Sequence, residues 1–131
     1  MADKIDSITI GNSTWDIDLP SDARPSIASL TASETIQAQT FNARSDARLK
    51  ENIIEYKPVE SILDLPVFEY DFKGGNGHRI GCLAQDLQKI CPELVHEGCD
   101  GYLTIEESKI VYPLLLEVRK LRAEVEELKR R

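Results

Sequence analysis

The chain has 131 residues, of which 41% are hydrophobic and 30% are charged, so one small domain with an appended segment is expected. Its net charge of −7 argues against a protein that follows a nucleic-acid backbone through basic side chains. No apolar run approaches the roughly 20 residues that a membrane-spanning helix needs, and the N-terminus has no signal-peptide pattern.

The first 44 residues differ from the rest in composition. The alternating stretch "SITIGNSTWDIDLP" predicts two strands joined by a turn at Gly11 and Asn12. A cluster of breakers at residues 20–25 follows, and residues 26–41 are rich in Ser, Thr, Ala and Gln with few large apolar side chains. Such a segment cannot bury enough surface to fold alone. We expect it to fold by wrapping with copies of itself, as β-structured fibres do.

The compact part begins after residue 44. Pro58 is expected to open a short helix in "PVESILDL", with Val59, Ile62 and Leu63 on one face. The next stretch, "PVFEYDF", predicts a strand with an aromatic face, and "KGGNG" predicts a hairpin turn before the returning strand "HRIGCLA".

Further along, "AQDLQKI" predicts a short helix that stops near Pro92. The stretches "ELVHE" and "YLTIEE" predict a strand pair around the turn "GCDG". Residues 45–109 therefore predict a small α+β domain of hairpins and short helices.

Two residue types that often mark cofactor or metal sites do not do so here. Cys82, Cys91 and Cys99 are an odd number without a CxxC pair, which argues against a disulfide framework and a zinc site. Three reduced thiols suit a reducing compartment. The glycines of residues 74–81 lack the spacing of a phosphate-binding loop. We expect no cofactor and no metal.

A heptad pattern follows, in a helix expected at about residues 108–131. Val111, Val118 and Val125 repeat at seven, and three leucines repeat at seven, three residues behind them: Leu114, Leu121 and Leu128. Valine at a and leucine at d predict a self-associating seam. This combination is usual in parallel dimers, so the pattern alone does not establish a trimer.

The flanking charges agree with a parallel arrangement. Glu117 and Glu124 fall at g, and they would face Arg122 and Lys129 at e of a neighbour. Each exposed pair contributes only about 0.2–1 kcal/mol, so the pairs serve orientation more than stability. The alternative is an ordinary amphipathic helix that packs on its own domain.

The charged stretch "NARSDARLKENI" allows two interpretations. Residue types alone favour Ser45 as the N-cap of a helix, with Asp46 in its first turn and an i,i+4 pair with Lys50. The functional interpretation needs Ser45 as a nucleophile and Lys50 as its base, which requires a lysine with a lowered pKa. Five residues do not align on a helix or a strand, so the two side chains would meet only through a bend or between subunits.

Four ordered blocks resemble one known family. These are "SDARLKENI", "VESILDLPVFEYDF", "GCLAQDLQKICPELV" and "DGYLTIEESKIVYPLLLEVRKLRAEVEEL". Together they resemble the intramolecular chaperone auto-processing domains that end phage tail fibres, tailspikes, neck appendages and endosialidases. Such domains also occur in a membrane-bound myelin regulatory transcription factor. The resemblance covers residues 45–131.

The resemblance implies a homotrimer with a C-terminal parallel coiled coil, in which the domain helps an upstream triple-stranded β-fibre to fold. The domain then cuts itself off before the motif serine, as a single-turnover serine endopeptidase with a serine–lysine dyad. Carried over, the dyad is Ser45 and Lys50, and the cleaved bond is Arg44–Ser45. Residues 1–44 would be the end of the fibre. The implied partners are two further copies and the upstream segment. From the net charge and the lack of a long apolar run we expect no nucleic-acid or membrane partner.

The same resemblance implies assembly in a host cytoplasm, with the fibre entering a virion and the chaperone released. His78 and His96 are alternative bases, although each stands alone near a turn and is expected on the surface. Two other functions remain open. The chain could be a trimerisation cap that never cuts, or a coiled-coil adaptor for another protein.

Overall fold

The computed structural model describes residues 4–10, 13–20, 31–32, 34–75 and 77–131, and for residues 4–20 it describes the backbone. The chain forms two compact units, Met1–Asp46 and Ala47–Arg131. The division falls within two residues of the boundary expected from the sequence, between residues 44 and 45. Each unit has its own internal structure.

The first unit contains the predicted hairpin. Strand β1 (Lys4–Ile10) pairs antiparallel with β2 (Ser13–Pro20), from Ile10 opposite Ser13 to Lys4 opposite Pro20. A proline at the end of β2 suits this position because it has no N–H to donate to the ladder. The expected turn at residues 11–12 and much of the breaker cluster lie outside the described residues. Residues 31–32 and 34–44 form neither helix nor strand.

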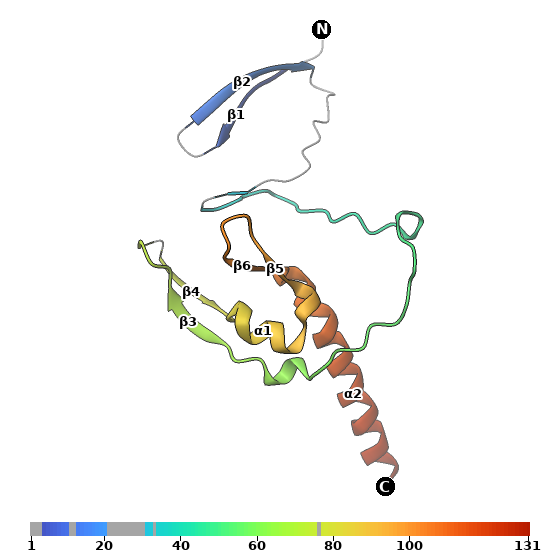
Figure 1. Ribbon diagram of the computed structural model, residues 1–131. Coiled ribbons are helices and arrows are strands. Elements are labelled where there is room, and N and C mark those ends of the chain that lie inside the picture. Colours follow the sequence, from blue (N-terminus) through green and yellow to red (C-terminus); the bar gives the residue numbers. More distant parts are fainter. Residues whose placement is uncertain (1–3, 11–12, 21–30, 33, 76) are drawn as a thin grey trace. The chain divides into compact units, whose positions relative to one another are not determined.

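The second unit is a small α+β domain, as predicted (Figure 1). Along the chain it contains β3 (Phe68–Asp71), β4 (His78–Gly81), α1 (Ala84–Ile90), β5 (Val95–Glu97), β6 (Leu103–Ile105) and α2 (Val111–Arg130). Strands β3 and β4 form one antiparallel hairpin, and β5 and β6 form another. Apart from the helix expected after Pro58, the predicted order of strands and helices is therefore confirmed, and the C-terminal helix lies within the expected range.

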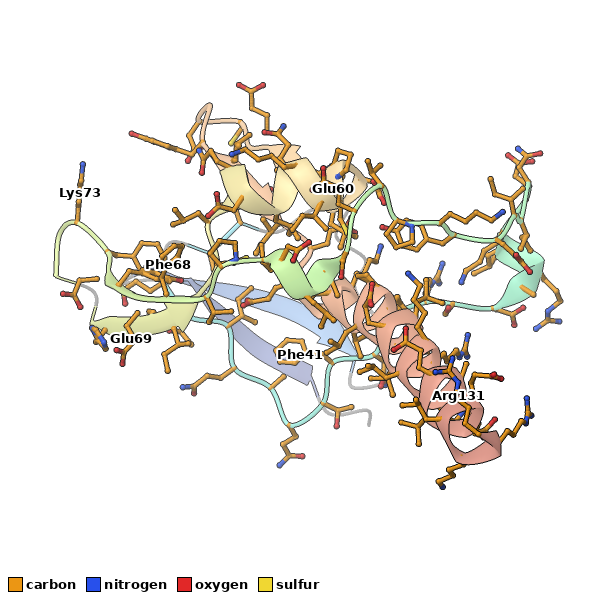
Figure 2. All side chains as sticks on the ribbon, turned by 90° about the horizontal axis from the view of Figure 1, so that it is seen from below. Phe41, Glu60, Phe68, Glu69, Lys73 and Arg131 are labelled. Atoms are coloured by element: carbon orange, nitrogen blue, oxygen red, sulfur yellow. The ribbon has the colours of Figure 1, made fainter. Side chains whose placement is uncertain are left out.

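The β3–β4 hairpin has the predicted aromatic face. The rings of Tyr70 and Phe72 meet edge to face, with centroids 5.3 Å apart and planes at 89°. Gly74, Gly75 and Gly77 have positive φ angles in the connecting turn, a conformation that other residues adopt at a cost. Lys73 lies at the tip of the hairpin (Figure 2). The glycines therefore serve the turn.

The predicted helix after Pro58 is wrong in length and in its buried face. Only a 3₁₀ turn forms, Ile62–Asp64, and Ser61 caps it by accepting a hydrogen bond from the N–H of Leu63 (3.2 Å). Pro66 disfavours a helical conformation of the residue before it, and Leu65 is extended with φ −70° and ψ 118°. Ile62 is buried, whereas Val59 and Leu63 are exposed.

The hydrophobic core of the second unit is small. Its fully buried members are Leu87 and Cys91, and four further residues complete it: Ile62, Ile90, Leu94 and Val95. Leu87, Ile90 and Cys91 lie three and four residues apart, so they share the inward side of α1. Partly buried Leu103 and Ile105 of β6 pack against this cluster. A core this small makes the domain sensitive to each buried side chain.

We expect a Leu87→Ala substitution to lower the free energy of unfolding by about 2–5 kcal/mol, because it leaves a cavity at a fully buried site. Leu63→Ala is the matched control, since that leucine is 58% exposed and its truncation is expected to cost under about 1 kcal/mol. Denaturant unfolding of both variants measures the difference. Equal losses would contradict the assignment of the core to α1.

Helix α2 begins after a 3₁₀ turn, Glu107–Ile110, and its 20 residues span about 30 Å. Its early turns pack on the domain through buried Pro113 and Glu117. The carboxylate of Glu117 accepts a hydrogen bond from the hydroxyl of Ser61 (Oγ–Oε1, 3.0 Å), which joins α2 to the capped turn before β3. Among the described residues, none of the helices has the length and apolar character required to span a bilayer.

Candidate functional site

The motif around Ser45 forms a tight turn. Residues Ala47–Leu49 make a single 3₁₀ turn, and the N–H of Lys50 donates to the carbonyl of Ala47 (3.1 Å). The interpretation of Ser45 as the cap of a regular helix is therefore wrong. A short charged segment without an apolar face to bury does not sustain a longer helix in water.

The two predicted catalytic residues lie on either side of this turn. Arg44 and Ser45 are exposed near the end of the first unit, and Lys50 is exposed directly after the turn, in the second. A spacing of five requires a bend, and the sequence alone did not show one. The chain does bend between the two positions, at Ala47–Leu49.

A second local feature follows Lys50. Asn52 has a φ of +53°, in the left-handed region, and the chain bends there. In the part of the chain that the structure describes, it is the one residue other than glycine with a positive φ. Lys50 is thus flanked by a 3₁₀ turn before it and a left-handed residue two positions after it.

Beyond Asn52 the chain runs to an anchor on the core. The hydroxyl of Tyr56 donates a hydrogen bond to the Sγ of buried Cys91 (3.3 Å). Partial burial raises the pKa of Tyr56, and the hydrogen bonds to Cys91 and Glu93 raise it further, so the hydroxyl stays protonated as a donor. Ile53 and Ile54, before the anchor, are 72% and 87% exposed. The sequence did not predict this anchor, because its partners are 35 residues apart.

An apolar pocket of about 570 Å³ lies beside the anchor. Tyr56 and Leu94 line one part of it, and Tyr112, Leu115 and Leu116 of α2 line another. Its lining carries charges of both signs, from Lys109 and Arg119 and from Glu55 and Glu93. No motif in the sequence pointed to this pocket, because its walls come from three separated segments.

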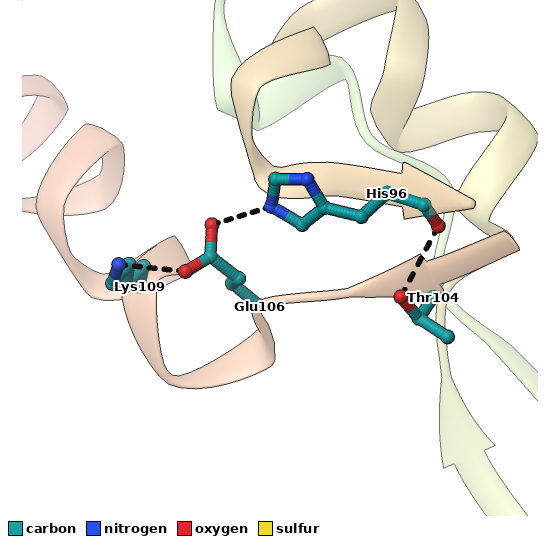
Figure 3. Close-up of polar contacts among 4 residues, drawn as sticks. All are labelled: His96, Thr104, Glu106 and Lys109. Carbon is teal, nitrogen blue, oxygen red and sulfur yellow. Dashed lines mark hydrogen bonds and ion pairs between the residues drawn. The ribbon is translucent and has the colours of Figure 1, made fainter. Parts of the chain in front are cut away.

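A polar cluster joins β5, β6 and the approach to α2 (Figure 3). The carboxylate of Glu106 accepts a hydrogen bond from Lys109 Nζ (2.6 Å), and its other oxygen lies 2.9 Å from His96 Nε2. The hydroxyl of Thr104 donates to the carbonyl of His96 (3.1 Å). The contact with His96, followed by that with Lys109, lowers the pKa of Glu106 below its ordinary value. The cluster ties the second hairpin to the start of the long helix.

We expect this cluster to make the domain sensitive to acid. Because the pKa of Glu106 is lower when folded, its contribution to stability is present above the ordinary carboxyl pKa of 4.5 and is lost as the pH falls through the lowered value. The Glu106→Gln variant should therefore melt at a lower temperature than the parent at pH 6, with the gap closing towards pH 3. Thermal melts across this range provide the measurement. A gap that stays constant would contradict the assignment.

Both histidines are on the surface, as predicted. His78 of β4 lies 2.8 Å from Asp71 and 3.5 Å from Glu69, both on the facing strand β3. His96 lies beside Glu106, as described above. These carboxylate neighbours were not predicted, although the cross-strand register places Asp71 directly opposite His78.

The six predicted seam residues line up on α2 and are 44–61% exposed: Val111, Leu114, Val118, Leu121, Val125 and Leu128. The helix therefore packs on its own domain through a different side, which includes Pro113 and Glu117. The structure gives Glu117 partners within the chain, Ser61 at 3.0 Å and Lys120 at 3.6 Å, which the heptad pattern did not predict.

Comparison with known proteins tests the resemblance to the intramolecular chaperone family. Residues 45–96 match the profile of a peptidase family described as chaperone of endosialidase. The resemblance to this family is confirmed. The match begins at Ser45, the residue that the resemblance implies as the nucleophile.

One curated relative is myelin regulatory factor homolog 1 of Caenorhabditis elegans. It is 34% identical over 90 residues, an alignment that covers 59% of this chain and 10% of that protein. The chain thus spans about a tenth of the relative's length.

Proposed function

We propose that this chain is an intramolecular chaperone that trimerises, helps an upstream β-structured fibre segment to fold, and then releases itself by cutting Arg44–Ser45. The observation that carries the proposal is the agreement of two boundaries. The family match starts at Ser45, and the compact second unit starts at Ala47. Both lie within two residues of the proposed cut.

The exposed seam of α2 supports self-association. Six apolar side chains at a and d positions, each about half exposed, form a continuous stripe that a single chain does not cover. Full burial of one exposed Leu or Val side chain contributes about 1.5–3 kcal/mol. Burial of the exposed halves of these six side chains would therefore stabilise a three-chain bundle. The partner with the matching pattern is a second copy of the same helix. Three copies, rather than two, are proposed from the family.

In the proposed cleavage, neutral Lys50 accepts the proton of the Ser45 hydroxyl. The Ser45 oxygen attacks the carbonyl carbon of Arg44, and the peptide C–N bond breaks as the Ser45 nitrogen takes up a proton. The acyl group of Arg44 is then an ester on the Ser45 oxygen. Water hydrolyses this ester, which releases the carboxylate of Arg44 and leaves Ser45 as a new N-terminus.

Cutting would then be coupled to assembly. The chain turns at Ala47–Leu49, between the serine and the lysine, and we propose that correct assembly supplies the geometry that the reaction needs. The fibre partner is residues 1–44, whose described part beyond the β1–β2 hairpin lacks helices and strands. We place these events in a host cytoplasm during phage assembly, with the fibre retained in a virion and the chaperone discarded.

Mass measurement under native and denaturing conditions tests this function. The proposal predicts a homotrimeric assembly that separates on denaturation into fragments 1–44 and 45–131. An uncut trimer would support the non-cleaving trimerisation cap instead. An uncut monomer would favour the coiled-coil adaptor, and either outcome would overturn the proposal.

A further inference from the structure

We infer that Asn52 is a positioning residue for the cleavage reaction, because its left-handed backbone sets the direction of the segment that carries Lys50. This inference rests on the proposed function. The observation behind it is the φ of +53° at Asn52, two residues after Lys50, in an exposed part of the chain.

The left-handed conformation has no explanation in packing. Asn52 is exposed, so buried neighbours do not force its backbone angle. Residues other than glycine rarely adopt positive φ, and asparagine tolerates it better than most. Backbone conformations of this kind concentrate at functional sites, where they fix the geometry of neighbouring groups.

The chain on each side of Asn52 is held by a hydrogen bond. On one side, Tyr56 fixes the chain to the core through its hydrogen bond to Cys91. On the other side, the turn Ala47–Leu49 is closed by the N–H of Lys50, so that residues 47–50 form a small local unit. Asn52 lies between the anchor and this unit. If the φ of Asn52 moved to the ordinary negative region, residues 47–50, including Lys50, would leave the anchored segment in a different direction.

A substitution series separates the backbone from the side chain. Glycine populates positive φ about as readily as negative φ, and aspartate also tolerates it, whereas alanine and valine disfavour it. When a substitution favours negative φ at residue 52, only the molecules that still have positive φ there can cut. The cleavage rate is then the full rate multiplied by the fraction of such molecules. The expected order of cleavage rates is therefore Gly and Asp near wild type, then Ala, then Val.

We expect Asn52→Gly to cut within about two-fold of wild type and Asn52→Ala to cut about five- to ten-fold more slowly. Neither Gly nor Ala keeps the amide group, so they form a matched pair that differs in backbone preference. Rates are measured on denaturing gels after dilution from denaturant. The same substitutions in a Ser45→Ala background, which is not cut, should leave the melting temperature and the assembly mass unchanged.

Three results would overturn the inference. If Gly and Ala variants are equally slow, the amide side chain acts and the backbone angle does not. If Asn52→Ala cuts at the wild-type rate, the angle does not matter. If the Ala variant is slow only because its uncut counterpart melts early or fails to assemble, the role is structural. A wild-type chain that is never cut would instead overturn the proposed function itself, together with this inference.

Discussion

Replacing Ser45 with alanine is expected to give an assembled chain that is not cut. The hydroxyl oxygen is the proposed nucleophile, and its removal leaves no atom to receive the acyl group of Arg44. The loss should reach about 10³-fold or more, which on a denaturing gel means the full-length chain alone. Ser45 is exposed, so its loss should change the melting temperature little.

The Lys50→Ala chain should behave like the Ser45→Ala chain, because the hydroxyl would then lack its base. Matched controls are available on the same domain. Ser108→Ala and Lys73→Ala each remove the same group from an exposed position outside the motif, and both chains should still cut. A fragment that begins at residue 45 in the Ser45→Ala chain would disprove the mechanism, as would loss of cutting in both controls.

A second large effect is expected at the seam of α2. Leu121→Asp places a charge in the middle of the a/d stripe, where assembly would otherwise bury the exposed half of a leucine, a gain of roughly half of the 1.5–3 kcal/mol for full burial. Leu121 is 51% exposed in the single chain, so the substitution should leave the fold of the domain intact. We expect monomers by native mass measurement and, because assembly precedes cutting, an uncut chain on denaturing gels.

The control for this variant is Ala123→Asp. Ala123 lies on the same helix at an exposed position outside the a and d sets, so the same charge there should leave assembly and cutting intact. A Leu121→Asp chain that still assembles would show that α2 is not the seam. A monomeric Leu121→Asp chain that still cuts would show that cleavage does not depend on assembly.

Local sequence signals predicted much of this fold. Three of these signals are the aromatic alternation of β3, the glycines of its turn and Pro92 after α1. Each acts over a few residues, so the sequence alone reveals it. The turn Ile62–Asp64 was mispredicted because Pro66 restricts Leu65, and that effect outweighed the apolar spacing. The contacts of Ser61 with Glu117 and Tyr56 with Cys91 join residues 56 and 35 positions apart, which periodicity does not reveal.

The sequence motif points to candidate site residues, but it does not give the backbone geometry around them. Ser45 and Lys50 were named from a motif, since their spacing fits neither helix nor strand. The 3₁₀ turn at Ala47–Leu49 and the left-handed Asn52 are the features that bend the chain there. Asparagine is compatible with several backbone conformations, so its presence in "KENII" did not predict a positive φ.

The most direct test of the account is to identify the N-terminal residue of the C-terminal fragment from the wild-type chain. We predict a fragment of residues 45–131 that begins with Ser45, together with a fragment of residues 1–44 that ends with a free carboxylate on Arg44. An intact chain of 131 residues under assembling conditions, or a fragment that begins at any other residue, would contradict the claim that this chain cuts at Arg44–Ser45.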